Sequence, residues 1–152
     1  VHLIEDWADT TLAIAVRTAF VQAAAIDPEL RVALLPEDVP VPFRQLMSNF
    51  PCEAVSGISE FFNKGESLEL LTRLENLSAL IESNQWLIGK SMSIADIAVA
   101  AQLSLLRFPA SAGQSLTGKG CPGFYDHPGL QTLFHWRDQL EDSIMQSDPA
   151  KI

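Results

Sequence analysis

The residues that could carry chemistry are few and widely spaced in this 152-residue chain. The three histidines, His2, His127 and His135, are dispersed, and no pair of them has the spacing of zinc ligands. The two cysteines, Cys52 and Cys121, match neither a metal-ligand spacing nor a disulfide framework. We therefore predict no metal site and two reduced thiols, as expected of a cytoplasmic protein.

The sequence contains little that would support nucleophilic catalysis. A serine hydrolase of the common type would need a Gly-x-Ser-x-Gly turn, and a phosphate-binding loop would need a glycine-rich turn that opens a helix; neither motif is present. Lys119 gives Cys121 a weakly basic neighbourhood, which makes that thiol a minor candidate for redox chemistry. We predict no catalytic residue in this chain.

One carboxylate, Asp96, stands at the head of a segment that is otherwise almost wholly apolar. Ser93 lies three positions before it, and this S-x-x-D spacing predicts a capping box at a helix start. A helix that is apolar nearly all round belongs inside a bundle, where unpaired N–H groups would cost about 1–3 kcal/mol each. Asp96 is therefore predicted to satisfy a buried helix end; the alternative is a catalytic acid.

The elements that must position these residues are predicted to be helices. Apolar residues recur at three- and four-residue steps, and no stretch alternates long enough to predict a strand. Five prolines between residues 26 and 65 leave only short helical pieces there. The fold class is all-α, in one domain over residues 1–152. The predicted helices are 1–25, 29–34, 41–49, 66–83, 93–107 and 128–145, with loops at 84–92 and 108–127.

Composition excludes several classes of partner. The formal net charge of −9 argues against nucleic acid or an anionic membrane as the main partner. No apolar run reaches the roughly 18 residues that a membrane helix needs. The chain starts at Val1 rather than Met and passes directly into a helical pattern, so we expect it to be part of a longer protein.

The stretch Trp86–Ala98, WLIGKSMSIADIA, resembles the F-L-x-G-x-x-x-[ST]-x-A-D signature of the glutathione S-transferase C-terminal domain. The opening Glu5–Asp9 and the stretch His127–Leu130 are similar to other parts of that domain. The resemblance implies a helical bundle of the glutathione S-transferase C-terminal type, preceded in the parent protein by a thioredoxin-like domain that this chain lacks. Two features depart from the family: Leu133 replaces a late aromatic residue, and the proline-rich stretch 26–51 matches no family pattern.

The resemblance also implies a function. Such proteins conjugate or reduce small apolar electrophiles with glutathione, whose thiolate is activated in the thioredoxin-like domain. The isolated chain is then expected to be inactive, and the parent protein to be a homodimer. The first helix and the buried central helix would line the electrophile pocket, and an acidic residue would reach glutathione in the neighbouring subunit. The implied contacts are Asp6 or Asp9 for glutathione and Trp7, Thr11, Arg17, Arg107 and Phe108 for the electrophile.

A second function stays open at this point. Domains of the same kind also serve as non-catalytic assembly modules in elongation-factor and tRNA-synthetase complexes, and an acidic surface would suit a basic partner. A thioredoxin-like domain upstream would favour the transferase, whereas an unrelated domain, or none, would favour the assembly module.

Overall fold

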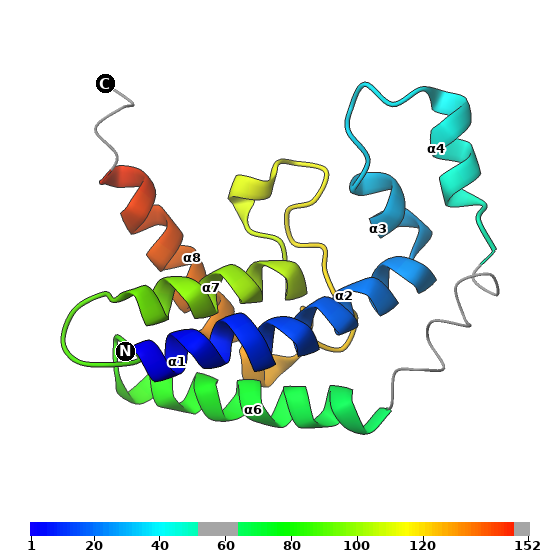
Figure 1. Ribbon diagram of the computed structural model, residues 1–152. Helices are drawn as coiled ribbons and strands as arrows, with labels where there is room; N and C mark the ends of the chain where they lie inside the picture. The colour runs from blue at the N-terminus through cyan, green and yellow to red at the C-terminus, as the bar shows by residue number, and fades with distance from the viewer. Residues whose placement is uncertain (52–63, 148–152) are drawn as a thin grey trace.

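The computed structural model describes residues 1–51 and 64–147, and its regular elements in these ranges are all helical (Figure 1). The predicted all-α fold class is confirmed for this part of the chain. The elements are α1 (His2–Trp7), the π-helix η1 (Ala8–Leu12), α2 (Ala13–Ile26), α3 (Pro28–Ala33), α4 (Val41–Ser48), α6 (Lys64–Ser83), α7 (Ile94–Leu106), the short 3-10 helices η2 (Ala110–Ala112) and η3 (Pro128–Leu130), and α8 (Gln131–Gln146).

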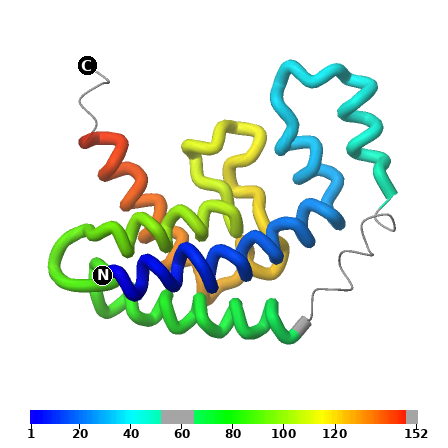
Figure 2. The backbone as a smooth tube through the Cα atoms, in the orientation of Figure 1, coloured from blue at the N-terminus to red at the C-terminus, as the bar shows by residue number. Residues whose placement is uncertain are grey.

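The elements α1, η1 and α2 follow one another as a single helical rod, because no glycine or proline interrupts residues 2–26. The rod lies beside both α6 and α7, and α8 packs against these two helices (Figure 2). The core fills the space between these helices. Its fully buried large side chains include Leu12, Val16, Leu74, Val99, Leu103, Leu106, Leu130, Leu133 and Phe134.

The short helices α3 and α4 form an arm that projects from the end of α2 (Figure 1). Pro28 occupies the first turn of α3, and the Asp27 carboxylate accepts hydrogen bonds from the Glu29 and Leu30 N–H groups at 2.8 and 3.1 Å. The Arg31 guanidinium donates to carbonyl oxygens at the ends of both α2 and α4. One arginine therefore fixes the arm to the bundle.

The helix α7 is less enclosed than the sequence indicates. Its buried face packs against the rod and α8, but Ile94 and Ile97 are 52% and 42% exposed. The expectation that this helix is buried nearly all round is therefore wrong. The reason is that the neighbours among the described residues cover only part of its surface. The buried residues of α7 are Ala95, Asp96, Val99, Ala100, Leu103 and Leu106.

Candidate functional site

The Asp96 carboxylate is buried and holds the start of α7 to the preceding loop. Its Oδ2 accepts hydrogen bonds from the Ser93 N–H at 2.8 Å and from the Ser93 hydroxyl at 2.6 Å. Its Oδ1 accepts from the Leu87 N–H at 2.8 Å, a contact nine residues away that the capping pattern does not contain. Both carboxylate oxygens are thus engaged by their own loop, an arrangement that fits a structural residue and not a catalytic acid.

Two of the residues that the resemblance implied for the electrophile lie together, at the end of α7. Arg107 and Phe108 line a hollow beside α8, and the Phe108 ring packs edge-to-face on Phe20, with 5.8 Å between the ring centroids. Arg107 donates to the Gln131 side chain at 3.0 Å and lies over the Phe134 ring. The α7 end therefore joins α2 and α8 through aromatic and cationic contacts.

The other implied contacts lie elsewhere. Thr11 lines a groove between the rod and α6, and Trp7 lines a neighbouring hollow on the same seam. Arg17, Asp6 and Asp9 are exposed, and none of them lines the hollows that hold Trp7, Thr11, Arg107 and Phe108. The described residues thus do not bring the implied contacts together into one pocket.

A buried arginine in α8, which the sequence pattern did not single out, closes the end of α7. Arg137 is fully buried, and its Nη1 donates to the Arg107 carbonyl oxygen at 2.6 Å. Its Nε donates to Asp138 Oδ1 at 2.8 Å, while Nη2 lies 2.7 Å from the same oxygen in a bent ion pair. A cation at the carboxyl end of a helix is favoured by the helix dipole. Only the packing of α8 on α7 reveals this role, because a lone arginine in an amphipathic helix carries no signal for it.

Cys121 has no setting for redox chemistry. The side chain is buried, and its Sγ donates to the Leu105 carbonyl oxygen at 3.6 Å. Burial raises the pKa of this thiol to about 12, so the nucleophilic thiolate is scarce at neutral pH. The minor candidacy of Cys121 as a redox nucleophile is therefore wrong. Cys52 lies outside the described residues.

His127 is the N-cap residue of η3, where its Nδ1 accepts a hydrogen bond from the Gly129 N–H at 3.3 Å, whereas His2 and His135 are exposed. Among residues 1–51 and 64–147, no group of three or more His, Cys, Asp and Glu side chains could hold a metal ion. No helix in the same ranges is long and apolar enough to cross a membrane.

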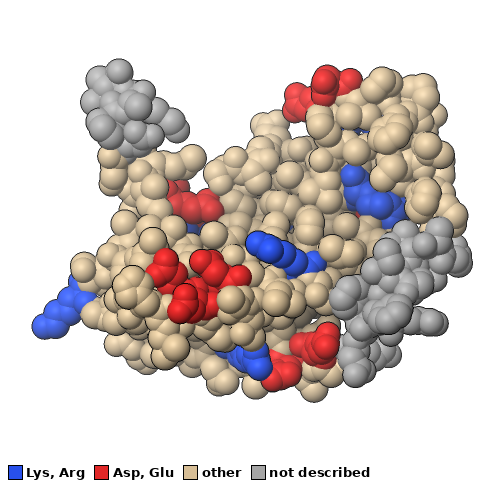
Figure 3. Space-filling model, viewed as in Figure 1, with Lys and Arg blue, Asp and Glu red and all other residues tan. Residues whose placement is uncertain are grey.

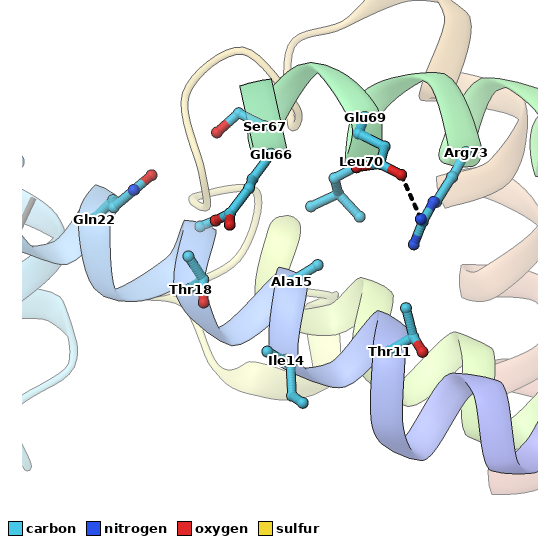
Figure 4. A pocket seen from close by; sticks show the side chains of 11 residues that line it. Thr11, Ile14, Ala15, Thr18, Gln22, Glu66, Ser67, Glu69, Leu70 and Arg73 are labelled. Atoms are coloured by element: carbon cyan, nitrogen blue, oxygen red, sulfur yellow. Dashed lines mark hydrogen bonds and ion pairs between the residues drawn. The ribbon is translucent and has the colours of Figure 1, made fainter. Parts of the chain in front are cut away.

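A groove of about 300 Å³ lies between the rod and the first half of α6 (Figure 4). The rod contributes residues at three- and four-residue steps, which places them on one face. We call it the α2–α6 groove. Its walls are Thr11, Ile14, Ala15, Thr18, Ala19 and Gln22 from η1 and α2, and Glu66, Ser67, Glu69, Leu70 and Arg73 from α6.

Polar side chains face one another across this groove. Gln22 extends from the rod toward the Ser67 end of α6, and the Glu66 side chain reaches from α6 toward Thr18 (Figure 4). The Arg73 guanidinium is paired with Glu69, with 2.5 Å between Nη2 and Oε1, which cancels one negative charge. The groove thus offers hydroxyl, amide and carboxylate groups with one net negative charge. It contains no arrangement of nucleophile and base.

Comparisons of the chain with protein-family models, with curated proteins and with solved structures found no match.

Proposed function

We propose that this chain is the C-terminal helical domain of a glutathione S-transferase-like protein. The observation that carries the proposal is the buried Asp96 carboxylate, which ties Leu87 and Ser93 to the start of α7. These residues lie in the same stretch, Trp86–Ala98, that resembles the transferase signature. A buried carboxylate with every bond inside one loop supports the interpretation of this stretch as a folding motif of that domain.

The proposed role of the chain is to support the chemistry and not to perform it. In this proposal, glutathione and its activating residue belong to a thioredoxin-like domain, and the helical domain supplies apolar wall surface for a small electrophile. The exposed Ile94 and Ile97 on α7 and the Phe20–Phe108 pair at its end are apolar groups suited to such a wall. In this proposal the α2–α6 groove, which has no nucleophile–base pair, takes no part in activating glutathione.

The test is to isolate the native protein, determine its intact mass and read the sequence that precedes Val1. The proposal expects a preceding domain with β-α-β order, and expects the native protein to conjugate glutathione to a chloronitroaromatic substrate. The 152-residue chain alone is expected to give no turnover in the same assay. Turnover by the chain alone, or a native protein without such a domain, would overturn the proposal.

A non-catalytic assembly module is the second candidate function. The observation that favours it is the polar lining of the α2–α6 groove, which carries one net negative charge and would suit a basic partner. A native protein that lacks glutathione turnover but copurifies stoichiometrically with a basic partner would select this candidate over the first.

A further inference from the structure

A second hollow adjoins the α2–α6 groove, between the end of α2, the first turns of α6 and the loop that follows α7. Its volume is about 320 Å³, and the loop residues Cys121–Phe124 form one of its walls. We call it the loop hollow. It shares Ala19, Gln22 and Ser67 with the α2–α6 groove, but the groove has no residue from the loop. Three segments far apart in the sequence therefore bound the loop hollow from different sides.

The loop hollow exists because the core-facing side chains of the rod become small toward the end of α2. Leu12 and Val16 fill the core with large apolar groups, whereas Ala19 and Ala23 continue the same helix face with one methyl group each. Both alanines line the hollow. A leucine at either position would occupy much of the space that is now open.

The loop hollow has a buried apolar floor and an exposed apolar rim. Ala23, Cys121 and Phe124 are 3%, 1% and 7% exposed, whereas Ile26 from α2 and Leu68 from α6 are 63% and 66% exposed. A small molecule seated on this floor would remove apolar surface of both helices from water. A concave and mainly apolar lining of this kind is typical of sites for small organic ligands.

The loop hollow offers no charge to a ligand. None of the described residues that line it is charged, and Figure 3 shows carboxylates gathered elsewhere, over α1 and over α6. The raised pKa of the Cys121 thiol keeps that group neutral at pH 7. A charged ligand would lose its hydration here without gaining an opposite charge from these residues. The Gln22 amide and the Ser67 hydroxyl, at the edge shared with the α2–α6 groove, can form hydrogen bonds with a neutral polar group.

We propose that the loop hollow binds a small neutral aromatic molecule that carries a single hydroxyl group. Its volume is about twice the roughly 150 Å³ of an apolar cavity that holds benzene, which suits two fused rings. The rings would pack between Ile26, Leu68 and Phe124, and the hydroxyl would bond to Gln22 or Ser67. This binding does not depend on glutathione chemistry, because it uses none of the residues assigned above to the electrophile wall.

The test is a titration of the ¹⁵N-labelled 152-residue chain with 2-naphthol at pH 7, followed by the chemical shifts of the backbone amides. We expect saturable binding with a Kd below about 1 mM. The largest shifts should occur at Ala23, Leu71 and Gly123, and smaller ones at Thr11 and Arg73 in the neighbouring groove. The anion 2-naphthoate has the same rings and should bind at least about tenfold more weakly, because its charge finds no partner.

Two variants alter the loop hollow itself. Ile26→Ser/Leu68→Ser removes the apolar rim at exposed positions, so the chain should fold, and it should weaken 2-naphthol binding at least about fivefold. Ala23→Leu fills the hollow from its floor and should abolish binding, with thermal unfolding as the check that this variant folds. If Ala23→Leu does not fold, the double variant decides.

The matched control is Leu3→Ser/Ile14→Ser, which removes two exposed apolar side chains of the rod, outside the loop hollow. This variant should bind 2-naphthol as the parent chain does. Three results would each overturn the proposal: no saturation below about 1 mM 2-naphthol, equal binding of 2-naphthol and 2-naphthoate, or equal losses in the two double variants.

Discussion

At the scale of single residues, two buried charged side chains determine how α7 is held at its ends. Asp96 engages three hydrogen-bond donors at the start of the helix, and Arg137 engages the Arg107 carbonyl oxygen at its end. Buried charges are tolerated only where such partners satisfy them, and removing one side of a buried pair leaves the other unsatisfied. Both residues should therefore matter far more to stability than exposed charges of the same type.

The substitution Asp96→Ala should lower the free energy of unfolding by about 3 kcal/mol, because the buried Leu87 N–H and the Ser93 N–H lose their acceptor together. Urea unfolding followed by circular dichroism would measure the change. Asp27→Ala is the matched control, since it removes an N-cap at an intermediate level of exposure and should cost only about 1 kcal/mol. Equal losses in the two variants would contradict the special role of Asp96.

The substitution Arg137→Lys should lower the free energy of unfolding by about 2–3 kcal/mol. A lysine keeps the charge but cannot reach the Arg107 carbonyl and the Asp138 carboxylate with the same planar fork. Thermal unfolding would measure the loss, with Arg73→Lys as the control. The control pair, Arg73 and Glu69, is exposed, so its change should stay below about 0.5 kcal/mol. An Arg137→Lys variant as stable as the parent would refute the forked contact.

Asp96 and Arg137 differ in how much of their role the sequence predicts. Asp96 was predictable because the S-x-x-D spacing acts within one turn of helix, where sequence separation and distance correspond. Its bond to Leu87 was not, since the loop before the cap has no fixed geometry. Arg137 gave no signal, because its partner Arg107 lies thirty positions away and only tertiary packing joins them.

At the scale of elements, local patterns predicted where helices lie but not their finer form. The predicted helices of residues 1–25, 66–83 and 128–145 correspond to the rod, to α6, and to η3 with α8, within a few positions at each end. The π-turn at η1 was not predicted. There the Ala13 N–H bonds to the Ala8 carbonyl oxygen, five positions back, and helix propensity alone does not distinguish this from an α-turn.

The close contact between α7 and the loop that follows it depends on a glycine. A Cβ atom built on Gly120 would lie 2.0 Å from the Leu106 carbonyl oxygen, where the Cys121 N–H also donates, at 2.9 Å. The loop backbone here is held against the end of α7 by the Arg107–Gly120 bridge. Any side chain at position 120 must therefore push the loop away from the helix.

We accordingly expect Gly120→Ala to lower the free energy of unfolding by about 2 kcal/mol or more, because backbone atoms must move to relieve the contact. Differential scanning calorimetry would record the fall in Tm. Gly65→Ala is the control: Gly65 lies in the first turn of α6 with open space around it, so the change should be neutral or slightly stabilising. If both variants melted like the parent, the tight approach at Gly120 would be disproved.

At the scale of the whole molecule, the candidate site could not be derived from the sequence. The implied contacts Trp7 and Thr11 lie along the seam between the rod and α6, whereas Arg107 lies at the end of α7, because their relative positions follow from the way the rod packs against α6 and α7. The α2–α6 groove was missed for the same reason. Glu66 appears in the sequence as an ordinary residue of a helix start. Its side chain reaches toward Thr18 only after two helices far apart in the chain come together (Figure 4).

The global stability of the molecule should also depend on alkaline pH through Cys121. Burial raises its pKa from the ordinary value of 9.0 to about 12 in the folded chain, because burial disfavours the thiolate. Above pH 9 the unfolded chain loses this proton while the folded chain keeps it, so rising pH favours unfolding. Below pH 9 the group contributes no pH dependence. The free energy of unfolding should fall by up to about 1.4 kcal/mol per pH unit between pH 9 and 12 from this group alone.

The alkaline effect can be isolated with two variants that differ only at this position. Cys52→Ser removes the other thiol, and Cys52→Ser/Cys121→Ala removes both, so lysine and tyrosine titration contributes equally to the two. Urea unfolding at pH 8.0 and at pH 10.5 should give the single variant a loss larger by about 2 kcal/mol than that of the double variant. Equal losses would mean that Cys121 ionises as readily in the folded chain as in the unfolded one. The packing of the loop after α7 would then be more open than the structure has it.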